Sequence, residues 1–108
     1  MIAALSPREL AAWRGDAARE APVLVDVREP WEYAICHIEG SQHVPLQTIP
    51  SRVDELSRDR DLVLICHHGN RSWRAAQWLE QHGFTRLYNL DGGVEGWASE
   101  VDPAMARY

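Results

Sequence analysis

Lysine is missing from this sequence of 108 residues, so the 11 residues that count as lysine or arginine are all arginines. A chain without lysine has neither the amine that forms Schiff bases nor the lysine of a nucleotide-binding P-loop. The formal net charge is -5, and the acidic residues are scattered along the chain, with no basic stripe among them. Because a nucleic-acid backbone is bound through clustered positive charge, we expect no nucleic-acid partner.

Long hydrophobic runs are also missing. The apolar run at residues 62–66 has only five members, whereas a membrane-spanning helix needs about 20. The first residues show neither the basic start nor the long apolar stretch of a secretory signal. We therefore expect no membrane partner and a cytoplasmic location.

Cysteine is scarce, because Cys36 and Cys66 are the only two and no Cys-x-x-Cys pair occurs. The usual spacings of zinc sites and of thioredoxin-like motifs are therefore absent. We predict no metal site and no cofactor. A reduced compartment with at least one working thiol fits this cysteine content better than a disulfide scaffold does.

The pattern of strands and helices predicts one α/β domain over residues 1–108, since the chain is long enough for one core and too short for two. Apolar runs rich in β-branched residues predict strands at residues 23–27, 62–66 and 86–90, with a short extended piece at 43–44. Strands that alternate with helices are typical of an α/β fold with a mainly parallel sheet.

Helix signals lie between these strands. Ser6, Pro7 and Glu9 have the arrangement of a capping box with proline at the first helical position, which predicts a helix that ends near Gly15. Further helices are predicted around residues 31–34, over 51–56, over 72–81 with Gly83 as the stop, and around Trp97. Residues 102–108 are expected to form a loosely packed tail.

Cys66 is the candidate nucleophile, because it ends a predicted strand and precedes a polar loop and a helix. A cysteine reacts as a thiolate, which is stabilised where the N–H groups of a helix N-terminus surround the sulfur. The loop offers no apolar anchor and consists of His67, His68, Gly69, Asn70 and Arg71. Gly69 allows the loop to curl so that its N–H groups form an anion nest, and Arg71 adds a permanent positive charge. The pattern therefore predicts a site for an anionic sulfur species.

Several of these residues have plainer interpretations. Cys66 on its own is compatible with a small buried hydrophobe at the end of a strand. His67 and His68 either raise the local positive potential when protonated, or donate hydrogen bonds to a bound anion, or face solvent. Without a carboxylate cluster they are a poor metal site. Asn70 either holds the loop in shape or adopts a positive φ.

The order of motifs along the chain resembles that of the rhodanese-like domain family. The matching motifs are Asp26-Val27-Arg28, Glu32-Tyr33, His37-Ile38-x-Gly40, Val44-Pro45, the loop from Cys66 to Arg71, Gly83-Phe84, Leu90-x-Gly92-Gly93 and Gly96-Trp97. They extend over about residues 24–97. The resemblance implies a five-stranded parallel sheet flanked by helices. It also implies that Cys66 takes sulfane sulfur from a donor such as thiosulfate and passes the persulfide to cyanide or a thiol.

Three other functions compete with this interpretation. Rhodanese-like phosphatases and arsenate reductases have one more residue between their cysteine and arginine than the four found here, so the present loop suits a single terminal sulfur. A sulfur-relay or regulatory module would hand the same persulfide to a specific protein. A noncatalytic interaction domain is disfavoured, because members of the family that lack activity commonly lack the cysteine.

The remaining motif residues are expected to be structural. Asp26 and Arg28 are expected to pair with each other's neighbours, and His37 to bond within its own turn. Cys36 stands where the family usually has glycine, either as a substitution without a role or as a second thiol that meets Cys66. Four tryptophans are expected in the core, at positions 13, 31, 78 and 97. Trp73, just after the loop, is expected to wall the pocket or contact a partner.

The loop length generates a first prediction. The protein should hydrolyse an aryl phosphate at a negligible rate, because the four residues between Cys66 and Arg71 leave a cradle that holds a single terminal sulfur but is too small to enclose a tetrahedral phosphate. Insertion of one glycine between Cys66 and Arg71 should improve oxyanion binding and weaken sulfur transfer. Steady-state assays of both reactions on both proteins test this, and robust phosphate hydrolysis by the unmodified protein would contradict the size argument.

Overall fold

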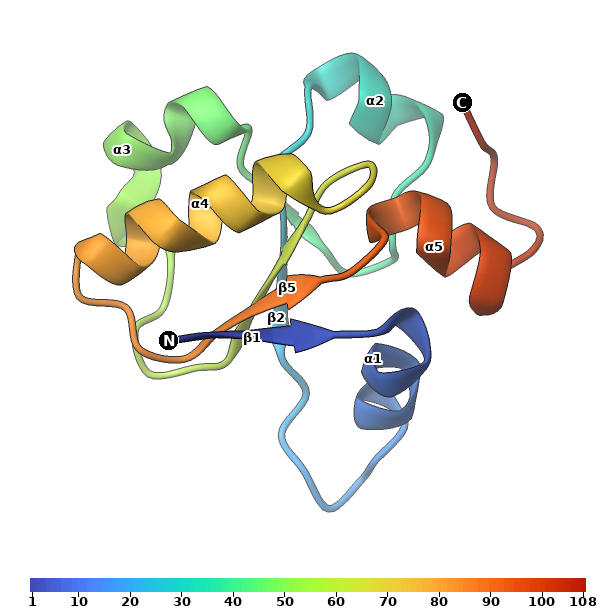
Figure 1. The fold of residues 1–108 in the computed structure, drawn as a ribbon, viewed down its shortest axis with the longest axis horizontal. Coiled ribbons are helices and arrows are strands. Elements are labelled where there is room, and N and C mark those ends of the chain that lie inside the picture. The colour runs from blue at the N-terminus through green and yellow to red at the C-terminus, as the bar shows by residue number, and fades with distance from the viewer.

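Five parallel strands form one sheet in the computed structural model, which describes residues 1–108 (Figure 1). The strands are β1 (Ile2–Leu5), β2 (Val23–Asp26), β3 (Gln42–His43), β4 (Leu62–Ile65) and β5 (Leu87–Leu90). Their order across the sheet is β1-β5-β4-β2-β3, and every neighbouring pair is parallel. The predicted α/β class and the five-stranded parallel sheet are confirmed, and β4 lies at the centre.

Helices cover both faces of the sheet (Figure 1). They are α1 (Pro7–Arg14), α2 (Pro30–Ile35), α3 (Ile49–Arg52), α4 (Asn70–Gln81) and α5 (Gly93–Glu100). Leu62 and Leu64 of β4 belong to the core cluster that includes residues of α3 and α4, whereas Val63 and Ile65 belong to the cluster with α1 and α5. Because β4 is buried on both faces, it has a continuous apolar sequence, as expected for a central parallel strand.

Two element predictions differ from the structure. The sequence does not predict β1, because residues 2–5 contain two alanines and no run of β-branched residues. In the structure Ala3 and Ala4 are exposed, as befits an edge strand. β1 joins the edge of the sheet through backbone pairing with β5, which nearly any residue type can make. The helix predicted over 51–56 is wrong in extent, since a 3-10 turn at Leu46–Thr48 precedes α3 and another at Val53–Glu55 follows it.

The helix signals themselves are mostly confirmed. At α1 the Ser6 hydroxyl accepts the Glu9 N–H at 3.1 Å, and the Glu9 carboxylate accepts the Ser6 N–H at 2.8 Å. α4 begins at Asn70, two residues earlier than predicted, and Gly83 follows it with a φ of +91°. No helix of the protein has the length and apolarity that a membrane crossing requires.

The expectation of a loosely packed tail at residues 102–108 is wrong. Met105 and Tyr108 pack against the core cluster that includes α1 and α5. The Tyr108 hydroxyl also hydrogen-bonds Arg28 and Glu32, which lie 80 and 76 positions earlier in the chain. This segment therefore returns to the sheet beside α2, where Figure 1 shows the end of the chain.

Of the four tryptophans expected in the core, Trp13 and Trp97 are buried and Trp78 is partly buried against it. The prediction is wrong for Trp31, whose side chain on α2 is 61% exposed. A six-residue helix has room for only a narrow buried face. That face is taken by the buried side chain of Glu32, so Trp31 is left at the surface.

Asp26 and Arg28 are expected from the sequence to pair with each other's neighbours. In the structure their side chains form an ion pair with each other. Both are completely buried, and Arg28 Nη2 lies 2.8 Å from Asp26 Oδ2. Arg28 also donates to the carbonyl oxygens of Glu32 and Cys36, at 3.3 and 2.6 Å. The pair therefore fastens α2 to the end of β2.

This buried pair generates a stability prediction. Asp26→Ala should lower the free energy of unfolding by about 3–5 kcal/mol, because it leaves the Arg28 guanidinium buried without its counter-ion. Asp61→Ala is the matched control, since its partner Arg86 is half-exposed and the pair lies at the surface. Chemical denaturation of both variants measures the difference, and an equal small loss in the two would contradict the role given to the buried pair.

Candidate active site

Cys66 lies at the floor of a polar pocket at the carboxyl end of β4. The pocket has a volume of about 250 Å³ and is lined by Cys66, His67, His68, Asn70 and Arg71. Cys66 itself is only 1% exposed. The structure thus brings together five of the six candidate residues, and the sixth, Gly69, forms the bend behind them.

Gly69 shapes the loop as the sequence predicts. Its φ of +111° and ψ of -8° lie in the left-handed region, which glycine adopts without a steric penalty. With this bend the Gly69 N–H points back and donates to Cys66 Sγ at 3.0 Å. Asn70 needs no positive φ, contrary to one of its two interpretations, because no residue other than glycine has one.

A second hydrogen bond to the sulfur comes from Ser72, which sequence reasoning missed. The Ser72 hydroxyl is buried, lies 3.3 Å from Cys66 Sγ and donates to Asn89 Oδ1 at 2.5 Å. Asn89 in turn donates to the Gly69 carbonyl oxygen at 3.2 Å. A hydroxyl has one proton, so Ser72 either donates it to Asn89 and can accept the thiol proton, or turns it to a thiolate. This series of hydrogen bonds can therefore accommodate Cys66 both as a thiol and as a thiolate.

The first turn of α5 holds the loop from behind. Val94 N–H donates to the Cys66 carbonyl oxygen at 2.9 Å, and Glu95 N–H donates to that of His67 at 3.1 Å. Gly93 has a φ of +56°, and a Cβ at this position would lie 2.3 Å from the Cys66 carbonyl oxygen. The Gly92-Gly93 motif therefore has a physical reason, since only glycine allows α5 to approach so closely.

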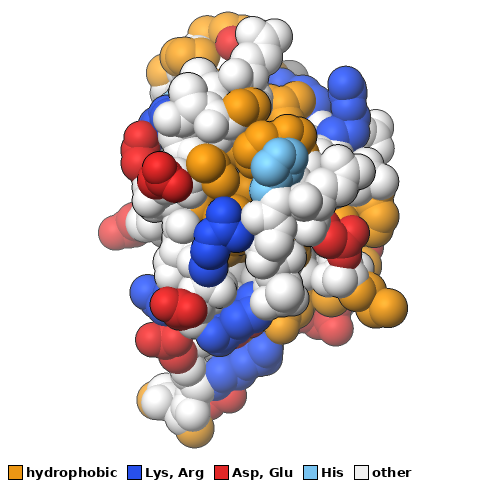
Figure 2. All heavy atoms as spheres, turned by 90° about the vertical axis from the view of Figure 1, so that its left-hand side faces the viewer, with side chains coloured by type: hydrophobic (Ala, Val, Ile, Leu, Met, Phe, Trp, Pro, Cys, Tyr) orange, Lys and Arg blue, Asp and Glu red, His pale blue; other side chains and the backbone are white.

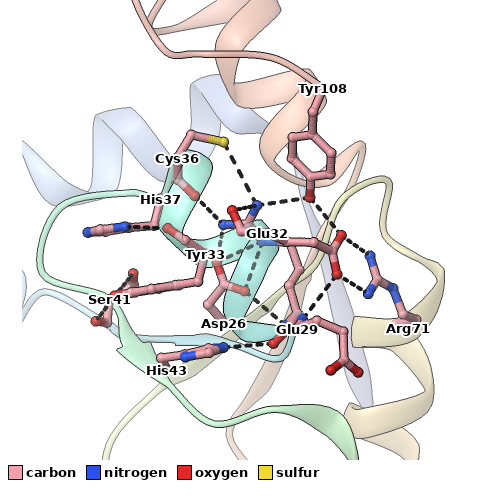
Figure 3. A network of polar contacts seen from close by, with 11 residues as sticks. Asp26, Glu29, Glu32, Tyr33, Cys36, His37, Ser41, His43, Arg71 and Tyr108 are labelled. Carbon is pink, nitrogen blue, oxygen red and sulfur yellow. Dashed lines mark hydrogen bonds and ion pairs between the residues drawn. The ribbon is translucent and has the colours of Figure 1, made fainter.

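Arg71 carries the permanent positive charge that the sequence predicts, but the structure pairs that charge with Glu32. Its Nη1 and Nη2 donate to Glu32 Oε1 and Oε2 at 2.7 and 2.8 Å, as Figure 3 shows. This paired guanidinium holds the pKa of Glu32 at about 2, although burial acts in the opposite direction. Sequence reasoning missed this role of Glu32, because 39 positions separate it from Arg71.

The two histidines differ in environment. His68 is exposed, whereas His67 is half-buried, with its ring between those of His68 and Tyr108 at centroid distances of 4.0 Å. Burial, and then the neighbouring His68, lower the pKa of His67. His67 is therefore neutral near pH 7 and acts as a wall of the pocket, not as a cationic helper.

A second hollow borders α4 further along the helix from the pocket. It is an apolar groove of about 220 Å³, lined by Leu46, Ile49, Pro50, Arg74, Ala75 and Trp78. Figure 2 shows apolar side chains gathered on this side, at the height of α3 and α4. The groove contains no nucleophile, and nowhere in the molecule do three metal-ligating side chains of His, Cys, Asp or Glu cluster.

Comparison with known proteins places this geometry in a family. A model of the rhodanese-like domain matches residues 6–100. The chain belongs to the rhodanese-like domain family. The resemblance drawn from the motif order is therefore confirmed.

Relatives of known name share most of the chain. The thiosulfate sulfurtransferase GlpE of Pseudomonas fluorescens is 41% identical over 103 residues, covering 95% of this chain and 91% of that protein. The probable adenylyltransferase/sulfurtransferase MoeZ of Mycobacterium tuberculosis is 38% identical over 106 residues, covering 96% of this chain and 26% of that protein. The crystal structure of SSP1007 from Staphylococcus saprophyticus has a TM-score of 0.83 at 28% identity, covering 93% of this chain and 97% of that one.

Other motif residues of this rhodanese-like chain support the site from outside it. His37 Nδ1 bonds the Tyr33 carbonyl oxygen at 2.9 Å, within its own turn as expected. Cys36 ends α2, partly buried, with its sulfur 3.8 Å from Arg28 Nη1, and both cysteines are free thiols. Trp73 is 40% exposed and does not line the pocket, so the expectation that it walls the pocket is wrong.

The close approach of α5 generates the next prediction. Gly93→Ala should lower the free energy of unfolding by at least about 1–3 kcal/mol, because the residue needs a positive φ and its Cβ would overlap the loop backbone. Gly15→Ala is the control, since its φ is -88° and its Cβ would meet nothing nearer than 3.6 Å. Chemical denaturation of both variants tests this, and an unchanged stability of Gly93→Ala would show that α5 and the loop separate freely.

Proposed function

We propose that the protein is a thiosulfate sulfurtransferase that carries sulfane sulfur as a persulfide on Cys66. The observation that carries this proposal is the position of Cys66 Sγ at the floor of the polar pocket, where it accepts the Gly69 N–H at 3.0 Å. The relationship to GlpE, a thiosulfate sulfurtransferase by name, over 95% of the chain supports the choice of donor. Residues 1–108 act as one domain in this proposal.

The reaction has two steps that balance in atoms and charge. The Cys66 thiolate attacks the sulfane sulfur of thiosulfate, the sulfur–sulfur bond of the donor breaks, and sulfite leaves with that electron pair. Cys66 then holds a persulfide whose terminal sulfur is anionic. Cyanide or a thiolate next attacks this terminal sulfur, which leaves as thiocyanate or as a new persulfide, and the Cys66 thiolate returns.

The loop residues have separate roles in this scheme. Gly69 N–H and the Ser72 hydroxyl hold the Cys66 sulfur, while His67, His68, Asn70 and Arg71 form the walls that receive the donor. Because Glu32 neutralises Arg71, the guanidinium orients the donor through its shape and N–H groups more than through net charge. The cycle needs a reduced thiol, which favours a reducing compartment such as the cytoplasm.

A sulfur relay to a protein thiol is the second candidate function. Trp73 follows the pocket loop in the first turn of α4, and its side chain is 40% exposed. Exposed aromatic side chains are enriched at protein interfaces. MoeZ, in which the matching region is 26% of the protein, also joins a sulfurtransferase to a second activity by name. In this variant of the proposal a protein thiol replaces cyanide in the second step.

The proposal predicts that Cys66→Ser abolishes thiosulfate-to-cyanide transfer, because the hydroxyl cannot form a persulfide, while the fold survives the small change in volume. Cys36→Ser is the matched control and should keep most of the activity. Mass spectrometry after exposure to thiosulfate should find one added sulfur, about 32 Da, on the wild type and on Cys36→Ser only. Substantial turnover by Cys66→Ser would overturn the assignment of the nucleophile, and a large loss in folded Cys36→Ser would implicate both thiols.

A further inference from the structure

We propose that Tyr108 is a positioning residue of the pocket, which holds Arg71 and His67 in place and thereby sets the capture of the donor. The inference rests on the proposed function for the identity of that donor. Tyr108 lies outside residues 6–100, which match the rhodanese-like domain. Its role therefore has to be argued from its contacts in this chain.

The hydroxyl of Tyr108 bridges two buried charges, and Figure 3 shows its contact with one of them, Glu32. It donates to Glu32 Oε2 at 2.8 Å and accepts a hydrogen bond from Arg28 Nη1 at 2.9 Å. Glu32 Oε2 is also the oxygen that receives Arg71 Nη2, at 2.8 Å. The hydroxyl therefore fixes the carboxylate that in turn fixes the Arg71 side of the pocket.

The hydrogen bond from the Tyr108 hydroxyl to the Glu32 carboxylate keeps the same donor and acceptor over a wide pH range. Burial raises the pKa of Tyr108 to about 12, so the phenol keeps its proton and remains a donor to Glu32. The pKa of Glu32 is about 2, mainly because of its hydrogen bonds with Arg71, so Glu32 remains an acceptor. Neither group changes state near neutral pH, as a positioning role requires.

The ring of Tyr108 holds the other side of the pocket. The Tyr108 ring stacks on the His67 ring at a centroid distance of 4.0 Å and an interplanar angle of 14°. The Trp31 ring contacts the Tyr108 ring edge-on, at a centroid distance of 5.7 Å and an angle of 72°. The His67 carbonyl oxygen is held independently by the N–H of Glu95, whose carboxylate pairs with Arg107. Residues 107 and 108 thus secure His67 both through its ring and through the helix that binds its backbone.

These contacts reach the walls of the pocket and not the nucleophile. The hydrogen bonds to Cys66 Sγ come from Gly69 and Ser72, and neither of these residues bonds Tyr108. Loss of Tyr108 should therefore weaken binding of the donor while the reactivity of the sulfur persists. This separates a positioning role from a general loss of structure, which would lower both.

Tyr108→Leu and Tyr108→Phe divide the role between ring and hydroxyl. Tyr108→Leu should raise KM for thiosulfate by about 5-fold or more with kcat changed less than about twofold, as expected when interactions with bound substrate are lost. Tyr108→Phe keeps the ring on His67 and should give a smaller rise in KM. Tyr88→Leu is the matched control, since Tyr88 packs on Trp13 at 5.0 Å and belongs to the same core cluster. It should lose stability without a change in KM.

A second measurement does not depend on turnover. NMR titration of the His67 ring should give a midpoint that rises toward the ordinary value of about 6.5 in Tyr108→Leu, because the ring that buries His67 is gone. Tyr108→Phe and Tyr88→Leu should leave the midpoint unchanged. The other charged or titratable groups that act on His67 are present in all three variants, and they are His68, Glu32, Glu95 and Arg28.

The outcomes separate this inference from the proposed function. If the wild type transfers no sulfur, the proposed function fails, and the His67 titration still tests the positioning of the pocket wall. If the wild type is active and folded Tyr108→Leu keeps both its KM and its His67 midpoint, the inference is overturned. A fall in kcat larger than the rise in KM would also overturn it. Should Tyr108→Leu not fold, Tyr108→Phe decides the hydroxyl part, and a KM equal to that of the wild type would contradict it.

Discussion

The burial of the Arg28 guanidinium is the constraint on which this end of the molecule depends. A cation without exposure to water needs an acceptor for nearly every N–H, because each unpaired one costs free energy. Asp26 supplies the counter-charge, the carbonyl oxygens of Glu32 and Cys36 supply two further acceptors, and the Tyr108 hydroxyl supplies another. These requirements place α2 and the segment after α5 beside the ends of the central strands.

The geometry of the pocket depends on how α2 and the segment after α5 pack around Arg28. Once α2 is fastened over Arg28, Glu32 reaches across to Arg71 and defines one wall. The floor is set separately, because Cys66 is held by Gly69 and Ser72 and its backbone by the first turn of α5. The side-chain contacts that hold the Cys66 sulfur therefore differ from those that hold Arg71, whereas the first turn of α5 holds the backbone of both Cys66 and His67.

Electrostatics at the site is local. A chain with a net charge of -5 does not attract an anionic donor from a distance. Arg71 is paired with Glu32, and His67 is neutral near pH 7 because burial lowers its pKa. What remains for an anion is the short-range hydrogen bonding of the pocket lining at the N-terminus of α4, which acts over a few ångströms. We expect such a site to select for size and shape, in keeping with a loop of four residues between Cys66 and Arg71.

The sequence by itself determined the central strands, the cap of α1 and the loop that begins at Cys66, because each depends on residues that are neighbours in the chain. It also identified Gly69 as the bend, since only glycine is suited to the left-handed conformation there. Only the tertiary structure decided that Glu32 neutralises Arg71 and that Tyr108 reaches the pocket. These contacts join residues 39 and 76 positions apart, and they follow from how the helices pack around a buried charge. A local pattern contains no information on which distant acceptor will satisfy such a charge, so the partners of Arg71 and Arg28 became visible only in the folded chain.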